Sequence, residues 1–293
     1  MSTDVALVTC RDLPELDPDD RPLAAALFER GLAVEIVAWD DPAFDWSATR
    51  LAVLRNSWDY FHRIDEFLAW AARVERFTRL ENPLAVVRWN LHKGYLVELA
   101  ARGAPVVPTA LVRRGERFDL ARRAAAGGWR RIVIKPAVSA DSWETHVVAA
   151  EELAAAQAHL DRLAAERDVL VQPFLDAVES DGERCLVFLD GSYSHAVRKN
   201  PITRGGRWTG LPEGTPVAAA PDELAAAERV LAAAGLGPLL YARVDLVRGA
   251  ADDPLLLELE LAEPTLFLAD APAGLSRLAD AVARRAVPSR AAD

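Results

Sequence analysis

Two apolar segments near the C-terminus constrain the fold most strongly, because charged residues interrupt each of them at every second position. The first segment carries Arg243 and Asp245, and the second carries Glu258 and Glu260 between leucines. Side chains alternate between the two faces of a strand, so each charged pair shares one face. We predict two strands that pair antiparallel across a turn at 249–254, which brings three carboxylates and one guanidinium together.

Carboxylates held this close repel one another unless a cation lies among them. Oxygen ligands on rigid strands, completed by a phosphate, are typical of magnesium sites. Asp245, Glu258 and Glu260 are therefore predicted metal ligands. The alternative is a pair of strands with ordinary charges on a solvent face, although the apolar residues between the carboxylates favour burial of both faces.

A second and a third segment indicate a nucleotide. Lys135 leaves a predicted strand into a loop of small residues, where its ammonium, Ser139 and backbone amides can contact phosphate. The apolar run 169–175 opens into a proline-containing hinge that can offer backbone groups to a purine, and Glu179 follows as a partner for ribose hydroxyls. Taken alone, a lysine at a strand end is usually just a solvated edge, and the hinge could equally be a core strand with a turn.

Composition excludes several classes of protein. The 293 residues carry 34 Lys and Arg against 44 Asp and Glu, a net charge of −10, which argues against a nucleic-acid-binding protein. No apolar run reaches about 18 residues, and the first residues lack the basic start of a signal peptide, so we expect a cytoplasmic protein that does not bind membranes. The motifs GxxxxGK[ST], GxGxxG, GxSxG and HExxH are absent.

Alternating strand and helix patterns predict a small parallel-sheet domain that ends near Pro83, followed by α+β architecture. The expected strands are 5–9, 34–38, 51–54, 106–109, 131–135, 145–148, 169–174, 183–189, 193–199, 239–247 and 255–261. The expected helices are 22–30, 67–77, 91–101, 120–126, 150–165, 221–234 and 274–286.

The order of these motifs along the chain resembles the ATP-grasp superfamily. Lys93 is expected on a helix after Asn90, Lys135 ends a strand, the hinge follows, and the Asp and Glu-x-Glu ligands come last. The resemblance covers roughly residues 85–290. It implies an ADP-forming ligase that activates a carboxylate as an acyl phosphate and passes it to an amine or a thiol. For this chain we expect an amine and therefore a C–N bond.

The fold implied by this resemblance combines α/β and α+β architecture. A pre-ATP-grasp parallel-sheet domain would span residues 1–85, and two α+β subdomains, 86–171 and 172–293, would clamp ATP between them. The resemblance also implies a homodimer. One departure is Asp141 in the phosphate loop, where the superfamily is usually glycine-rich, because an acidic side chain there would repel a triphosphate.

The resemblance assigns roles to individual residues. The expected nucleotide contacts are Lys93, Lys135, Ser139, Gln172, Phe174, Leu175, Glu179, Lys199 and Arg243. The expected catalytic residues are Lys135, Arg207 and Arg243. The cofactors are ATP and two Mg²⁺ ions, for which Mn²⁺ can substitute, held by Asp245, Glu258 and Glu260.

Several stretches are more specifically similar to the O-ureido-D-serine cyclo-ligases of D-cycloserine biosynthesis and their relatives. These stretches are 55–60, 81–83, 87–90, 197–201 and 258–264. The similarity implies a small amino-acid-like substrate, ring closure within one molecule and a place in antibiotic biosynthesis. The alternatives are an intermolecular amino-acid or peptide ligase, a phosphotransferase, and a non-catalytic nucleotide-binding protein on the same fold.

The substrate is expected to bind at two places. The expected residues are Arg55, Trp58, Asp59, Arg198, Arg204 and Arg207. The first three follow a predicted strand of the parallel sheet, and ligands bind at the carboxyl ends of such strands. Arg204 and Arg207 lie in 200–212, whose glycines and arginines suit a lid over an anionic substrate. The alternatives are a structural turn for the first group and a solvated loop for the second.

Overall fold

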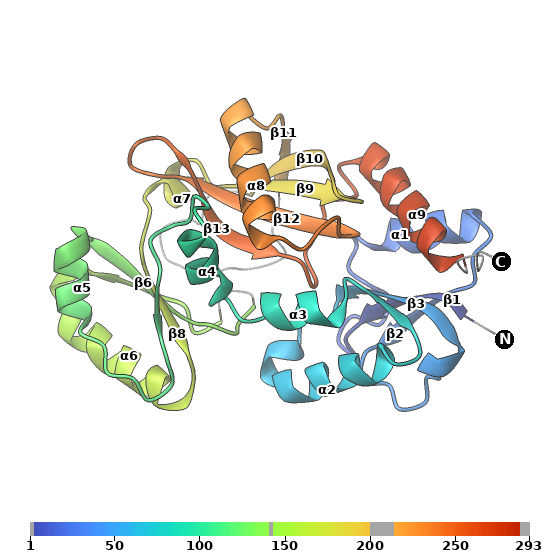
Figure 1. Ribbon diagram of the computed structural model, residues 1–293, viewed down its shortest axis with the longest axis horizontal. Helices are drawn as coiled ribbons and strands as arrows, with labels where there is room; N and C mark the ends of the chain where they lie inside the picture. The colour runs from blue at the N-terminus through green and yellow to red at the C-terminus, as the bar shows by residue number, and fades with distance from the viewer. Residues whose placement is uncertain (1–2, 141–142, 200–213, 288–293) are drawn as a thin grey trace.

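The computed structural model describes residues 3–140, 143–199 and 214–287. The strands of these residues form three sheets, which follow one another along the long axis of the molecule (Figure 1). No helix in the described part of the chain is long and apolar enough to cross a membrane.

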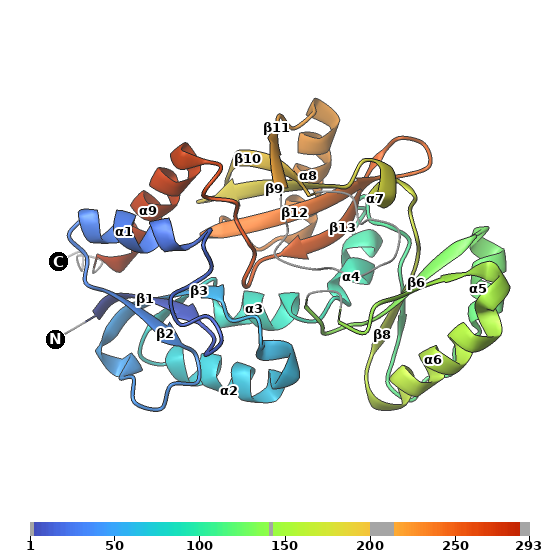
Figure 2. The same ribbon diagram turned by 180° about the vertical axis from the view of Figure 1, so that it is seen from behind.

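The N-terminal sheet is parallel, with the strand order β2-β1-β3-β4. Its strands are β1 Thr3–Thr9, β2 Val34–Ala38, β3 Thr49–Asn56 and β4 Arg79–Glu81. Strands β1 and β3 are apolar on both faces because helices cover both. Helices α1 (Arg21–Glu29) and α9 (Pro272–Ala286) lie on one face and α2 (Ile64–Val74) on the other (Figure 1 and Figure 2). The predicted parallel sheet is confirmed, although α9 comes from the far end of the chain.

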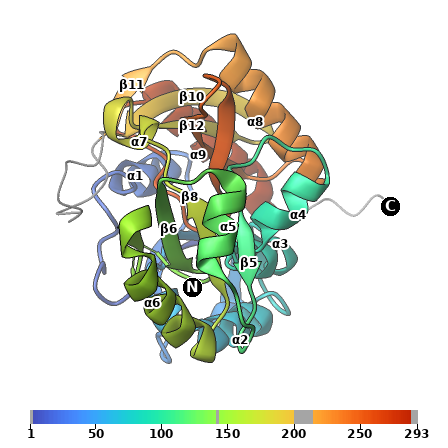
Figure 3. The same ribbon diagram turned by 90° about the vertical axis from the view of Figure 1, so that its left-hand side faces the viewer.

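The second sheet is antiparallel in its three strand pairings, with the order β5-β8-β6-β7. Its strands are β5 Ala110–Val112, β6 Arg131–Pro136, β7 His146–Ala149 and β8 Val169–Pro173. Helices α5 (Leu120–Gly127) and α6 (Leu153–Glu166) pack on one face, where leucines and isoleucines form a separate core (Figure 3). The predicted boundary between the subdomains 86–171 and 172–293 falls inside strand β8. This boundary stays a prediction.

The third sheet is also antiparallel, with the order β11-β10-β9-β12-β13. Its strands are β9 Glu183–Leu189, β10 Ser192–Lys199, β11 Gly214–Val217, β12 Tyr241–Arg248 and β13 Pro254–Glu260. Helices α8 (Pro221–Ala234) and α4 (Tyr95–Ala101) share an apolar core with one face. The opposite face packs on α9 at one end and carries charged side chains at the other.

The segment around Lys93 differs from the prediction of one helix over 91–101. The chain forms α3 (Leu84–Asn90) and then α4, with a break between them. In the break the Lys93 amide donates a hydrogen bond of 2.7 Å to the Ala137 carbonyl, which replaces a bond within a helix. Lys93 therefore lies between two helices and not on one.

The predicted strand over 106–109 is also wrong. Val106 forms only an isolated bridge to Leu256, and the next strand of the chain is β5. The remaining short elements are α7 Ala177–Ser180 and the 3₁₀ turns η1 Trp46–Ala48, η2 Tyr60–His62 and η3 Ala150–Glu152. Strands β4 and β11 and these short elements carry too few residues for a period to be recognised in the sequence.

One buried side chain joins the N-terminal sheet to the third sheet. Asn82 is fully buried, and its amide nitrogen donates to the carbonyls of Tyr241 and Leu261 at 2.9 and 2.7 Å. Its amide oxygen accepts from the Leu240 amide at 3.1 Å. The side chain thus satisfies backbone groups where the two sheets meet.

We expect Asn82→Ala to lower the free energy of unfolding by about 2–4 kcal/mol, because buried groups left without a partner cost about 1–3 kcal/mol each. Urea denaturation measures this change. Glu228→Gln, on the exposed side of α8, serves as the surface control and should stay within about 0.5 kcal/mol of the unmodified protein. An Asn82 variant as stable as this control would contradict the role of Asn82 between the sheets.

Candidate active site

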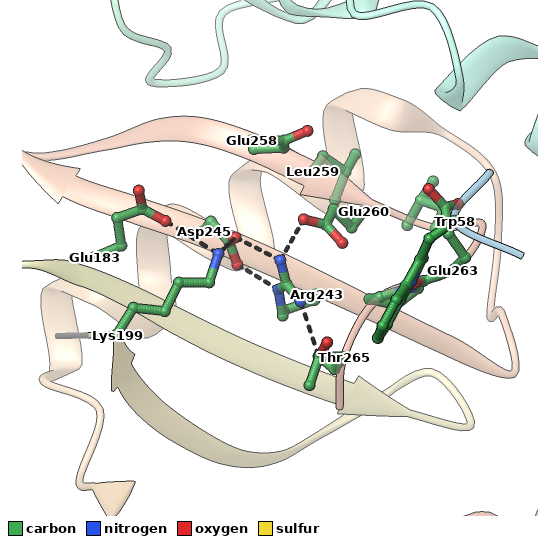
Figure 4. A network of polar contacts seen from close by, with 12 residues as sticks. Trp58, Glu183, Lys199, Arg243, Asp245, Glu258, Leu259, Glu260, Glu263 and Thr265 are labelled. Atoms are coloured by element: carbon green, nitrogen blue, oxygen red, sulfur yellow. Dashed lines mark hydrogen bonds and ion pairs between the residues drawn. The ribbon is translucent and has the colours of Figure 1, made fainter. Parts of the chain in front are cut away.

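The charged faces of β12 and β13 meet as the sequence predicts. In the antiparallel register, Arg243 lies opposite Glu260 and Asp245 lies opposite Glu258. The guanidinium of Arg243 donates two hydrogen bonds to Asp245, at 2.8 and 2.9 Å, and a further one to Glu260 (Figure 4). One cation therefore holds two of the three carboxylates together.

Strand β13 lies at the edge of its sheet, and two polar side chains satisfy its outer backbone groups. The Tyr95 hydroxyl donates to the Leu259 carbonyl at 2.9 Å and accepts from the Leu259 amide at 3.0 Å. Asn90 donates to the same carbonyl and accepts from the Leu261 amide, both at 2.7 Å. An unpaired edge strand is easily displaced, so these contacts fix the backbone between Glu258 and Glu260.

The cation cluster sets the protonation of the buried carboxylates. Burial opposes the ionisation of Asp245, but Arg243 and Lys199 outweigh it and lower the pKa of this carboxyl. Burial raises the pKa of Glu260 to about 7, because its attraction to Arg243 does not offset the loss of solvent. Asp245 is thus held ionised, whereas a further cation beside Glu260 would favour the ionised form of that carboxylate.

The chain contains three lysines, and all three line one cavity of about 540 Å³. The Lys199 ammonium lies 2.7 Å from Asp245, and the Lys93 ammonium lies 3.1 Å from Glu258. Lys135 forms no ion pair within the described residues; burial lowers its pKa, and the nearby charge of Lys93 acts in the same direction. Three cationic side chains converging on one cavity suit a polyanion such as a triphosphate.

The hinge after β8 forms one end of this cavity. Gln172, Phe174 and Leu175 line it, and Gln172 donates to the Thr109 hydroxyl at 2.9 Å. The Phe174 amide is already used, because it donates to the Arg131 carbonyl at 2.9 Å. Ser139 also lines the cavity and is nearly fully buried. The four side chains predicted here from the hinge and the phosphate loop therefore surround one space.

Two of the predicted substrate residues have structural roles instead. Arg55 is completely buried, pairs with Asp20 at 2.9 Å and donates to the Pro264 carbonyl at 2.8 Å. Asp59 accepts from the Trp39 indole and from Arg63, both at 2.7 Å. Neither residue lines the cavity, whereas Trp58 between them does.

Glu179 and Arg198 also lie outside the cavity lining. Both oxygens of Glu179 accept hydrogen bonds of 2.9 Å from Arg131, which keeps this carboxylate away from a ribose. Arg198 neighbours Lys199 on β10, so its side chain points to the opposite face of the sheet, the face that α8 covers. The predicted residues Arg204 and Arg207, the lid over 200–212 and Asp141 lie outside the described residues.

The cavity also contains residues to which the sequence analysis gave no role. Those with polar side chains include Tyr60, Glu183, Glu263 and Thr265. The Glu183 carboxylate lies 3.1 Å from the Lys199 ammonium. Glu183 is two residues from Cys185 on β9 and so shares its strand face, and Cys185 lies opposite Asp245 on β12. Strand alternation was therefore the signal that could have indicated Glu183. The scarcity of lysine was a second signal, since a chain that uses arginine elsewhere keeps three lysines for one site.

The comparisons with known proteins agree with this geometry. Residues 5–82 match the family model of the N-terminal domain of D-cycloserine synthetase DcsG. The chain is 38% identical over 303 residues to the cycloserine biosynthesis protein DcsG of Streptomyces lavendulae, a match that covers 97% of this chain and 99% of that protein.

Solved structures extend the similarity to the fold. The crystal structure of D-cycloserine synthetase DcsG superposes with a TM-score of 0.90 at 38% identity, over 97% of this chain and 99% of that one. The ATP-grasp ligase PsnB, complexed with a precursor peptide and AMPPNP, superposes with a TM-score of 0.65 at 18% identity, over 98% of each chain, which shows the shared fold alone. The chain belongs to the DcsG family of ATP-grasp ligases and is an ATP-dependent carboxylate–amine ligase that forms C–N bonds.

Proposed function

We propose that this enzyme closes O-ureido-D-serine into the ring of D-cycloserine, with ATP and Mg²⁺. The observation that carries the proposal is the match to a D-cycloserine synthetase over almost the whole length of both chains. The cavity supports it, because it combines a cationic centre for a triphosphate with carboxylates for a metal.

The nucleotide would lie across the cavity from the hinge to β12. Gln172, Phe174 and Leu175 would hold the adenine, and Glu183, which lines the cavity, would bind the ribose in place of Glu179, whose carboxylate pairs with Arg131. The phosphates would meet the cations and Ser139. The proposed phosphate ligands are Lys93, Lys135, Lys199 and Arg243.

The donor set fits Mg²⁺. Glu258 and Glu260 offer oxygen atoms on one strand face at the cavity, and hard oxygen donors with phosphate are what Mg²⁺ binds. Asp245 would be a third ligand if Lys199 turns from it to a phosphate oxygen. Bound Mg²⁺ would neutralise charge on the phosphate groups as a Lewis acid, as in other phosphoryl transfers.

The chemistry needs little proton transfer at first, because the substrate carboxylate is ionised near neutral pH. A carboxylate oxygen attacks the γ-phosphorus, ADP leaves, and an acyl phosphate forms. The nitrogen bonded to oxygen in the same molecule then attacks the acyl carbon, and phosphate leaves as a five-membered ring closes. Hydrolysis of the carbamoyl group, with loss of CO₂ and ammonia, would complete D-cycloserine. Positioning and electrostatic stabilisation supply most of the catalysis.

Analysis of the products tests this function against its alternatives. With O-ureido-D-serine, ATP and Mg²⁺, we expect ADP, phosphate and a product that matches authentic D-cycloserine by chromatography and mass. Condensation of two molecules would indicate an intermolecular ligase, and a stable phosphorylated product would indicate a phosphotransferase. Nucleotide binding without any ADP release would mean that the proposed substrate is wrong. Sedimentation of the same preparation tests the expected homodimer.

We expect Lys135→Ala to weaken ATP binding by about ten- to a hundredfold, because a charge-assisted hydrogen bond contributes about 1.5–3 kcal/mol. Lys135 is the lysine of the cavity with no ion pair in the described structure, so its removal breaks no ion pair, and Glu258 keeps Lys93 as its partner. Calorimetric titration with a non-hydrolysable ATP analogue measures the effect. Arg229→Ala, exposed on α8, is the matched loss of one positive charge. Equal affinities of the two variants would contradict the phosphate role.

A further inference from the structure

Four carboxylates line the cavity within the described residues, and three of them are matched to a cation. The matched pairs are Glu183 with Lys199, Glu258 with Lys93, and Glu260 with Arg243. Glu263 is the fourth; it forms no ion pair within the described residues, and only the more distant charge of Lys93 favours its ionised form. A carboxylate at the wall of a cavity without such a partner is a place for a positive group of a ligand.

Neighbouring residues hold Glu263 in a fixed position. The Tyr60 hydroxyl donates a hydrogen bond to the Glu263 carboxylate, and Tyr60 is itself almost fully buried. The Trp58 indole donates to the Glu263 backbone carbonyl at 2.9 Å. Arg55 donates to the next carbonyl, that of Pro264, at 2.8 Å. The carboxylate is thus oriented before any ligand arrives, which lowers the entropic cost of binding.

Glu263 lies at the side of the cavity where the amino-acid substrate would bind. Figure 4 shows Glu183 and Lys199 at one side of the charged cluster, Arg243 and Glu260 in the middle, and Glu263 with Trp58 at the other side. Glu263 lies across Arg243 and Glu260 from Lys199, so the space beside Glu263 is available to the amino-acid substrate. A carboxylate that is phosphorylated near Glu260 has its α-amino group only two bonds from the acyl carbon.

The electrostatics of Glu263 agree with the lack of an ion-pair partner. Burial raises the pKa of Glu263 to about 8 and the charge of Glu260 adds to this effect, while the charge of Lys93 and the hydrogen bond from Tyr60 offset only part of it. A cation placed beside the carboxylate would favour its ionised form and reverse part of the shift.

We propose that Glu263, oriented by Tyr60 and Trp58, binds the α-ammonium group of the amino-acid substrate and so sets the position of the carboxylate that is phosphorylated. This proposal rests on the proposed function in that the substrate is a small amino acid. It makes Glu263 a residue that selects amino acids over the corresponding acids without an amino group. Tyr60 and Trp58 act through Glu263 as positioning residues.

The experiment compares two ligands that differ only in the α-amino group. O-ureido-D-serine and its analogue without that group are titrated by calorimetry into the full-length enzyme saturated with Mg²⁺ and a non-hydrolysable ATP analogue. We expect the enzyme to prefer the amino acid by about ten- to a hundredfold, as for other charge-assisted contacts. Glu263→Gln should bind both ligands with nearly equal affinity, Tyr60→Phe should lose part of the preference, and Glu228→Gln should keep all of it.

The outcomes separate this proposal from the proposed function. A full preference in Glu263→Gln, or no preference in the unmodified enzyme, overturns the role of Glu263. Unchanged affinity for the ATP analogue shows that each variant is folded, and Tyr60→Phe carries the test if Glu263→Gln does not fold. A lost preference in Glu263→Gln supports the ammonium site even where the unmodified enzyme forms no D-cycloserine, a result that would count against the proposed function alone.

Discussion

Replacing Glu258 with glutamine should lower the rate of ADP formation by about a hundred- to a thousandfold, the loss typical when one preorganised electrostatic group is removed from an active site. Glutamine has the same shape but no negative charge, so it binds a divalent cation poorly. The backbone around Glu258 is held by Tyr95 and Asn90, and its Lys93 partner can still bond to the amide oxygen. The fold should therefore survive. Coupled-assay turnover at saturating ATP and Mg²⁺ measures the loss.

Two controls define what this result means. Circular dichroism and the melting temperature should match those of the unmodified enzyme, and Glu228→Gln removes one surface carboxylate without a change in rate. Raising the Mg²⁺ concentration should restore only part of the activity, because the ligand itself is missing. Turnover of the Glu258 variant close to that of the unmodified enzyme would exclude Glu258 as a metal ligand.

Replacing Arg243 with methionine should lower the free energy of unfolding by about 3–5 kcal/mol, the usual cost of removing one partner from a buried ion pair. The guanidinium is 3% exposed and holds both oxygens of Asp245, whose own exposure is 0%. Without it, Asp245 keeps Lys199 as its nearest cation. ADP formation should fall as well, because Arg243 also faces the proposed phosphate site. Guanidinium denaturation and turnover measure the two effects.

The pH dependence of the lost unfolding free energy shows whether the Arg243–Asp245 pair is its cause. Arg243 and Lys199 lower the pKa of Asp245, so the pair stabilises the fold above the ordinary aspartate pKa of about 3.9, and that stability is lost as the pH falls through the folded value. The deficit of Arg243→Met should therefore shrink below about pH 4. Adding Asp245→Asn should recover part of the stability near neutral pH. If Arg243→Met alone were as stable as the unmodified protein, the Arg243–Asp245 pair would contribute nothing to the free energy of unfolding.

Local patterns in the sequence sufficed for the parts of the protein that depend on near neighbours. Strands β12 and β13 are joined by a short turn, so their alternation also defines the register that brings Arg243 opposite Glu260. The hinge and Lys135 belong to adjacent strands β8 and β6 of one sheet. The resemblance of these motifs to ATP-grasp enzymes then supplied the family, which the comparisons confirm.

Contacts between distant segments could not be predicted in this way. Arg55 and Asp59 look like ligand-binding residues after a strand, but Asp20, 35 residues before Arg55, and Trp39, 20 residues before Asp59, engage them. Glu179, on α7, pairs with Arg131 on β6, a contact between segments 48 residues apart. A charged side chain in a sequence does not reveal which opposite charge it will meet.

By itself, the sequence determined the strand faces, the charged cluster of β12 and β13 and the set of motifs that defines the family, because strand alternation and short connections are properties of neighbouring residues. Only the tertiary structure decided which charges are paired inside the fold and which remain for a ligand. Glu263 and Tyr60 are about 200 residues apart in the sequence, so packing and not local preference sets their contact. They meet where Trp58 and Arg55 donate hydrogen bonds to the carbonyls of Glu263 and Pro264. Burial and pairing are collective properties of the folded chain, and they distinguish a structural ion pair from a binding site.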